Sequence, residues 1–94
     1  MRYMLLAKIS AYGAKKYQER LRRSKETTKR LGIKVEAIYY TQGEYELIEA
    51  IDAPNAEVVL ALTTWFNKAG YGTISAMPCF DVPAMKRADK KAGR

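Results

Sequence analysis

The sequence predicts an α+β domain in which a four-stranded antiparallel sheet carries two helices on one face. Three observations favour it. Apolar segments of strand length alternate with amphipathic segments of helix length, their order is β-α-β-β-α-β, and glycine-containing turns separate several of them. This order is that of the split β-α-β, or ferredoxin-like, arrangement. Right-handed crossovers then place both helices on the same face of the sheet.

The first strand and the first helix are predicted in the N-terminal third of the chain. Tyr3–Ile9 is a nearly continuous apolar run of strand length. From Ala14 to Leu31, apolar and small residues recur at spacings of three and four on one helical face, while the other face is almost wholly Lys and Arg. Ser10–Gly13 forms the junction before this helix, and Gly32 supplies its C-terminal cap.

A β-hairpin is predicted next. Ile33–Thr41 and Tyr45–Ile51 have the composition of strands, and the short link between them contains Gly43, which favours a tight antiparallel turn with positive φ. Regular alternation would divide the side chains of the second strand between the two faces of the sheet. One face would carry Val35, Ala37 and Tyr39, and the other Ile38 and Tyr40.

The second helix and the fourth strand complete the predicted fold. The helix covers Ala56–Lys68, with Asp52 or Asn55 as its N-cap, and Gly70 lies just beyond its end. Thr73–Phe80 is the fourth strand. We place the domain at residues 1–81, and we expect residues 82–94 to be a basic C-terminal tail that forms a frayed helix.

Composition excludes several classes of protein. The 94 residues suffice for one domain, and 48% hydrophobic with 29% charged residues excludes a disordered chain. No apolar run approaches the ~20 residues of a membrane span. The absence of histidine excludes Ser-His-Asp and Cys-His catalysis and the usual zinc sites, so we expect no cofactor and no metal. The single cysteine, Cys79, permits no internal disulfide and fits the reducing cytoplasm, and we expect its thiol to be buried and unreactive.

Charge is distributed in blocks along the chain. Residues 14–34 hold nine basic and two acidic groups, residues 35–81 hold one basic and seven acidic groups, and residues 82–94 hold five basic groups and one acidic group. Such blocks fit a solvated helix face, charge-matched self-association or polyanion binding. Specific RNA recognition is not expected, because the cations lie on the first helix and acids occupy the third strand. Non-specific, salt-sensitive adhesion to polyanions remains open.

Both faces of the predicted sheet carry apolar side chains. In the first strand Leu5 and Ala7 alternate with Met4 and Leu6, so each face receives apolar groups. Two helices can cover only one face, and an exposed apolar patch of this size is unusual in a monomer. We therefore expect the chain to form a homodimer or a larger closed oligomer through its second sheet face.

The segment YYTQGEYELIEAIDAPN, residues 39–55, resembles the signature of the GYD-domain family. The similarity extends to Gly13-Ala14-Lys15, to Leu31–Val35 and to Gly70 before the last strand, and covers the chain to about Phe80. Glu46 stands where the family has Asp. The resemblance implies a ferredoxin-like fold related to dimeric α+β barrels, and it implies no particular activity, because the family is functionally uncharacterised.

The candidate ligand-binding residues are those that would line a cavity between two protomers. They are Tyr3, Tyr39, Tyr40, Tyr45 and Glu46. Tyrosines offer ring surface and hydrogen-bonding hydroxyls to a small ligand, or they simply form an aromatic cluster at the interface. Glu46 and Glu49 are the acids of the third strand that acid–base chemistry would require.

Three functions follow, in order of preference. The first is a non-catalytic oligomeric module that binds a small molecule between protomers. The second is a cofactor-free enzyme of the dimeric α+β barrel type, resembling a small monooxygenase and using Tyr and Glu. The third is polyanion binding through the basic first helix.

Overall fold

The computed structural model describes residues 1–93 and confirms the α+β fold with a four-stranded antiparallel sheet. The described chain forms strands and helices in the predicted order, with the first helix divided into two and with a helix in the C-terminal tail, where the sequence predicts one. The elements are β1 (Arg2–Ile9), α1 (Ala11–Lys15), α2 (Tyr17–Arg30), β2 (Lys34–Tyr40), β3 (Leu47–Asp52), α3 (Ala56–Lys68), β4 (Gly72–Pro78) and α4 (Val82–Ala92).

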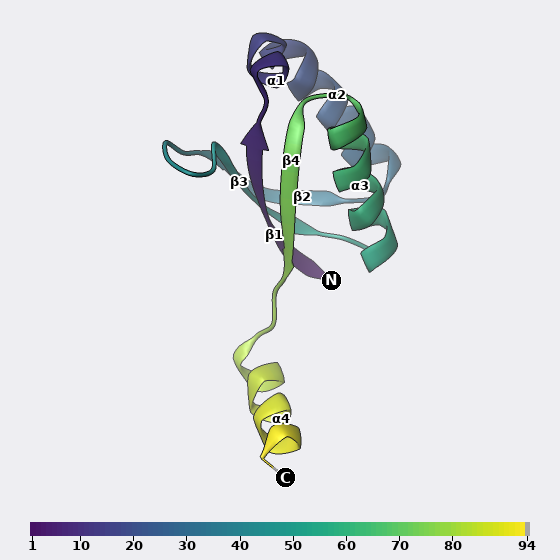
Figure 1. Cartoon of the computed structure of the whole chain (residues 1–94). Helices are drawn as coiled ribbons and strands as arrows, with labels where there is room; N and C mark the ends of the chain where they lie inside the picture. The colour runs from purple at the N-terminus through teal and green to yellow at the C-terminus, as the bar shows by residue number, and fades with distance from the viewer. Residues whose placement is uncertain (94) are drawn as a thin grey trace.

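The sheet has the strand order β2-β3-β1-β4, so β1 and β3 are central and β2 and β4 are the edges. All neighbouring strands are antiparallel. Helices α1, α2 and α3 lie on one side of the sheet, whereas α4 extends away from the rest of the molecule (Figure 1). None of the helices in residues 1–93 has both the length and the apolar character needed to cross a membrane.

The hydrophobic core lies between the sheet and helix α3. Tyr3 and Leu5 of β1 and Ile51 of β3 contribute side chains from the sheet, and Val59 and Leu62 contribute side chains from α3. These are alternate residues of each strand and one stripe of the helix, as amphipathic periodicity requires. The helices therefore cover one face of the sheet, which we call the helix face, and leave the other, the open face, uncovered (Figure 1).

The first helix begins earlier than predicted and is interrupted. Ser10 is the N-cap of α1, and its hydroxyl accepts a hydrogen bond from the backbone N–H of Gly13 at 2.9 Å. Lys16 separates α1 from α2 with φ −98° and ψ 38°. The N–H of Ser10 also donates to the carbonyl of Tyr71, at 2.8 Å, which joins the start of α1 to the residue before β4.

Strand β2 contains a β-bulge that overturns the predicted division of its side chains. Val35 pairs with Ile51, but Ala37 pairs with the next residue of β3, Ala50, so Glu36 is the extra residue of the bulge. The extra residue changes which face the later side chains occupy. Val35 therefore lies on the helix face with Ile38 and Tyr40, while Ala37 and Tyr39 lie on the open face.

The C-terminal segment differs from the expectation for Cys79. Strand β4 ends at Pro78, and Cys79 follows it with an exposed side chain, so the prediction of a buried thiol is wrong. Its backbone N–H still donates to the carbonyl of Arg2, at 2.9 Å. Helix α4 starts from Asp81, whose carboxylate accepts from the N–H of Ala84, and none of its residues in the described chain is buried.

Candidate functional site

A partly enclosed hollow lies on the helix face, between α2, α3 and the sheet. Its volume is about 170 Å³. Most of the lining is apolar, and a few polar side chains reach it from α2 and β3. The lining residues are Arg20, Leu21, Ser24, Lys25, Thr28, Val35, Ile38, Leu47, Glu49, Leu62, Phe66 and Ile74.

Glu49 is the acid in this hollow. It follows Leu47 by two positions in β3, so strand alternation turns both side chains to the helix face, where Ile51 also lies. Burial raises the pKa of the Glu49 carboxyl above its ordinary value of 4.5. Within residues 1–93 the carboxyl forms no hydrogen bond or ion pair that would offset this burial. Glu49 therefore retains its proton to a higher pH than a solvated glutamate does.

Arg20 is the cation in the same hollow, and its side chain is 5% exposed. Its Nε donates to the carbonyl oxygen of Gly13 at 3.1 Å, and the guanidinium lies over the ring of Tyr17. Helical periodicity assigned the Lys and Arg residues of this helix to its outer face. Arg20 is an exception because the turn at Gly13 offers an unpaired carbonyl, which the linear sequence does not reveal.

Arg20 and Glu49 do not neutralise each other. No ion pair within 4.0 Å joins them in the described chain, and every fully buried polar side-chain atom there has a hydrogen-bond partner. The Arg20 Nη atoms and the Glu49 oxygens, which have no such partner, are therefore accessible at the hollow. The hollow thus combines a mainly apolar lining with a few polar groups, among them the separate Arg20 and Glu49, which is the usual composition of a small-molecule site.

The predicted tyrosines lie on different surfaces. Tyr3 is a core residue on the helix face, and Tyr39 is 67% exposed on the open face. Tyr40 lies on the helix face, where its ring meets Tyr17 edge-on at 6.3 Å between centroids. Burial first, and then Tyr17, raise the pKa of Tyr40. Within one chain these residues do not line a common hollow.

Tyr45 and Glu46 lie in the segment between β2 and β3. The ring of Tyr45 is 5.5 Å from the ammonium of Lys8. A carboxylate oxygen of Glu46 accepts from the backbone N–H of Ile9 at 2.6 Å, and the N–H of Glu46 donates to the carbonyl of Ala7. Both contacts of Glu46 join this segment to β1, so in this structure its carboxylate has a structural partner.

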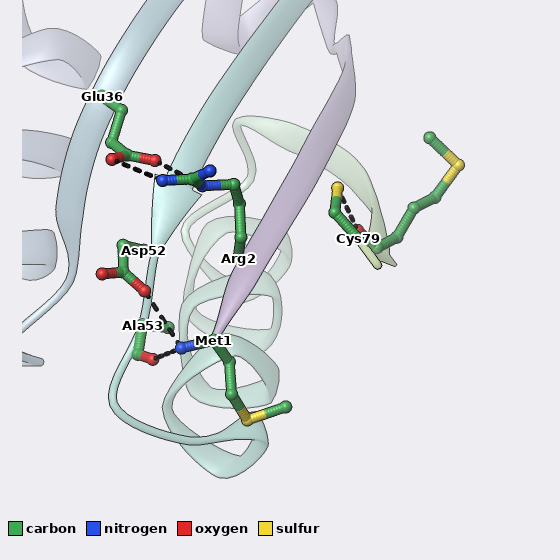
Figure 2. A network of polar contacts seen from close by, with 7 residues as sticks. Met1, Arg2, Glu36, Asp52, Ala53 and Cys79 are labelled. Carbon is green, nitrogen blue, oxygen red and sulfur yellow. Dashed lines mark hydrogen bonds and ion pairs between the residues drawn. The ribbon is translucent and has the colours of Figure 1, made fainter. Parts of the chain in front are cut away.

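The open face bears the apolar patch that the sequence predicts. One row across the strands joins Tyr39, Ile48, Leu6 and Ser75, and a second joins Ala37, Ala50, Met4 and Met77. Paired charges border one end of it: Arg2 donates to both oxygens of Glu36, at 2.9 and 3.2 Å (Figure 2). Beside them, Asp52 accepts from the Met1 ammonium at 3.0 Å.

The basic groups of α2 do not meet the aromatic surface of the sheet. Exposed cations such as Arg22 and Lys29 lie on the helix layer, whereas Tyr39 lies on the opposite, open face. A nucleic acid would need phosphate contacts and stacking platforms within reach of one strand. Within residues 1–93, no group of three acidic or cysteine side chains is placed to hold a metal ion.

Comparison with known proteins identifies the family. The model of the GYD domain matches residues 3–88, which is most of the chain. This protein belongs to the GYD domain family. The match extends past the expected domain boundary at residue 81 and ends at residue 88, within α4. No curated protein and no solved structure matches this GYD domain significantly.

Proposed function

We propose that this GYD domain protein is a non-catalytic, homo-oligomeric module that binds one small, mainly apolar molecule in each protomer. The observation that carries the proposal is the hollow around Glu49, which is enclosed, largely apolar and furnished with polar groups. This moves the predicted ligand from the space between protomers to the space beneath α2. A cavity of about 150 Å³ holds a benzene-sized molecule, so about 170 Å³ suits a ligand of similar or slightly larger size.

Self-association belongs to the same proposal. The apolar rows of the open face are bordered by charges that already have partners, Arg2 with Glu36 and Met1 with Asp52. Two copies that meet through this face would bury apolar area without burying an unpaired charge at that border. The ligand hollow lies on the opposite side of the sheet, so dimerisation leaves its entrance free.

The ligand proposal is tested by native mass spectrometry and by filling the hollow. Mass spectra of the purified protein report subunit number and any retained molecule together. Toluene binding is then followed by amide NMR shifts in wild type, in Ser24→Phe, whose ring would occupy the hollow, and in Arg22→Phe, a control on the exposed surface of the same helix. We expect Ser24→Phe to abolish the shifts and Arg22→Phe to keep them. Wild type that binds neither toluene nor any retained molecule would refute the proposal.

A cofactor-free enzyme is the second candidate, and the raised pKa of Glu49 is what favours it. A carboxyl that keeps its proton in an apolar hollow can act as a general acid. The test is chemical: a molecule recovered with the protein is incubated with fresh wild type and with Glu49→Gln, and products are sought. Turnover by wild type alone supports an enzyme, whereas unchanged ligand in both supports the binding module.

A further inference from the structure

The polar groups of the hollow define what kind of ligand it accepts, an inference that rests on the proposed function. We infer that the ligand is a neutral, compact apolar molecule with one hydrogen-bond-accepting oxygen, such as a ketone, and that Glu49 in its protonated form and Arg20 donate to that oxygen. Four observations lead to this class: the apolar lining, the unpaired Glu49 carboxyl, the position of Arg20 and the engagement of Thr28.

The apolar lining determines the body of the ligand. Leu62, Phe66 and Ile74 form one side of the hollow from α3 and β4, and none of them offers a polar atom. A charged ligand would lose its hydration on binding, and this side of the hollow offers no polar contacts to compensate for that loss. The body is therefore apolar, and its single polar end must point toward Glu49 and Arg20.

Arg20 and the protonated Glu49 carboxyl are both hydrogen-bond donors. Arg20 carries only N–H groups and has no acceptor, and it keeps its charge at any relevant pH. A protonated Glu49 carboxyl offers an O–H. Thr28 also lines the hollow, but its hydroxyl already lies within hydrogen-bond distance of the carbonyls of Ser24 and Lys25, at 3.0 and 3.1 Å. An oxygen acceptor satisfies both donors, whereas an ammonium would meet Arg20 with like charge.

The elements packed around Glu49 carry few other charged or titratable groups. Helix α2 presents Arg20 and Lys25, both cationic, and β2 presents Tyr40, whose pKa is raised above 10.0 with Tyr17 beside it. From α3, β4 and the β1 residue paired with Glu49, the groups are apolar: Leu62, Phe66, Ile74 and Leu5. Within this set, Glu49 is the carboxyl whose charge changes when it loses its proton.

The test compares three probes with the same number of heavy atoms: cyclohexanone, methylcyclohexane and cyclohexylamine, which is cationic below pH 9. Dissociation constants come from NMR titration of the full chain. Below the pKa of Glu49, cyclohexanone should bind at least about fivefold tighter than methylcyclohexane, and the cation should not bind measurably. Above that pKa the advantage of the ketone should decline with each pH unit toward the smaller advantage that Arg20 alone supports.

Variants of Glu49 separate this inference from the proposed function. Glu49→Gln keeps a donor at every pH, so the ketone preference should persist without pH dependence. Glu49→Leu should lower the preference, at every pH, to the part that Arg20 alone supports, and Glu44→Gln, which alters an exposed acid of the loop before β3, should behave as wild type. Equal binding of ketone and hydrocarbon, or tighter binding of the cation, would overturn the inference and leave the binding module intact. Failure of all three probes would count against the module itself.

Discussion

Glu49 shows how a single residue sets the chemistry of the hollow. Its neighbours in β3 on the same face, Leu47 and Ile51, are buried apolar residues. An apolar residue would therefore also suit position 49. A carboxyl there loses hydration and receives no hydrogen bond or ion pair within residues 1–93. It is therefore tolerated in its neutral form, and its ionisation opposes folding.

This gives a pH dependence of stability with a definite sign. The pKa of Glu49 is raised in the folded chain, so its contribution is fully favourable below the ordinary value of 4.5 and is lost as pH rises through the folded value. Asp52, whose pKa is lowered first by its hydrogen bond to the Met1 ammonium, acts in the opposite sense as pH falls. Urea unfolding of wild type and Glu49→Gln from pH 4 to 8 isolates the effect. The free energy of unfolding of Glu49→Gln should exceed that of wild type by an amount that grows with pH. A difference that stays constant with pH would contradict a raised pKa of Glu49 in the folded chain.

Two glycines with similar backbone angles test close packing at the residue scale. Gly72 has φ 145° and Gly43 has φ 150°. A Cβ at Gly72 would lie 2.0 Å from the carbonyl oxygen of Lys8, whereas a Cβ at Gly43 would meet nothing within 4 Å. Gly43→Ala therefore costs about 1 kcal/mol from strain alone, and Gly72→Ala costs at least about 3 kcal/mol. Chemical denaturation measures the loss of unfolding free energy in each variant. Equal losses would contradict the close approach of Gly72 to the carbonyl oxygen of Lys8.

At the scale of elements, the helices differ in how they are held. Helix α3 buries Val59, Leu62 and Phe66 against the sheet, whereas α4 buries none of its described residues. An isolated helix of about 11 residues is marginal in water. The stability of α4 in a single chain thus depends on local groups, above all its N-cap Asp81, while α3 is held mainly by packing.

The two N-caps give a matched prediction. Asn55 accepts from Val58 N–H at 3.0 Å and Asp81 accepts from Ala84 N–H at 2.8 Å. Asn55→Ala should lower the free energy of unfolding of the whole domain by about 1 kcal/mol. Asp81→Ala should leave it unchanged and lower only the helicity of α4, measured by amide hydrogen exchange. A global loss from Asp81→Ala would mean that α4 packs on something, which a second copy would supply.

The sequence predicted the elements better than their irregularities. Apolar periodicity identified all four strands and α3, because burial on one face imposes its period on the residues. The helix interruption at Lys16 was not predicted, and neither was the bulge at Glu36, which depends on the pairing of β2 with the distant strand β3. Local pattern contains no signal for either, and the bulge alone moves Ala37 and Tyr39 to the opposite face from that occupied by Val35.

At the scale of the whole molecule, the question is whether the apolar open face stays in contact with water in a monomer or is covered by a second copy. Ile48 lies in the central strand β3, between Leu6 and Tyr39 in its cross-strand row. In the proposed oligomer Ile48→Lys would bury an unpaired charge, which should weaken association by about 100-fold or more. Leu60→Lys is the control, because Leu60 is an exposed apolar residue of α3, away from this face. Sedimentation across a concentration series measures both, and a wild-type monomer would contradict the proposed assembly.

The sequence by itself determined the α+β class, the order of strands and helices, the two apolar faces of the sheet and the family resemblance, because each follows from periodicity and local composition. Only the tertiary structure decided that Tyr3, Tyr39 and Tyr40 lie on different surfaces and that Arg20 turns inward beside Glu49. The hollow exists because α2, α3 and β3 pack at particular distances and angles. No stretch of residues read in order contains that geometry.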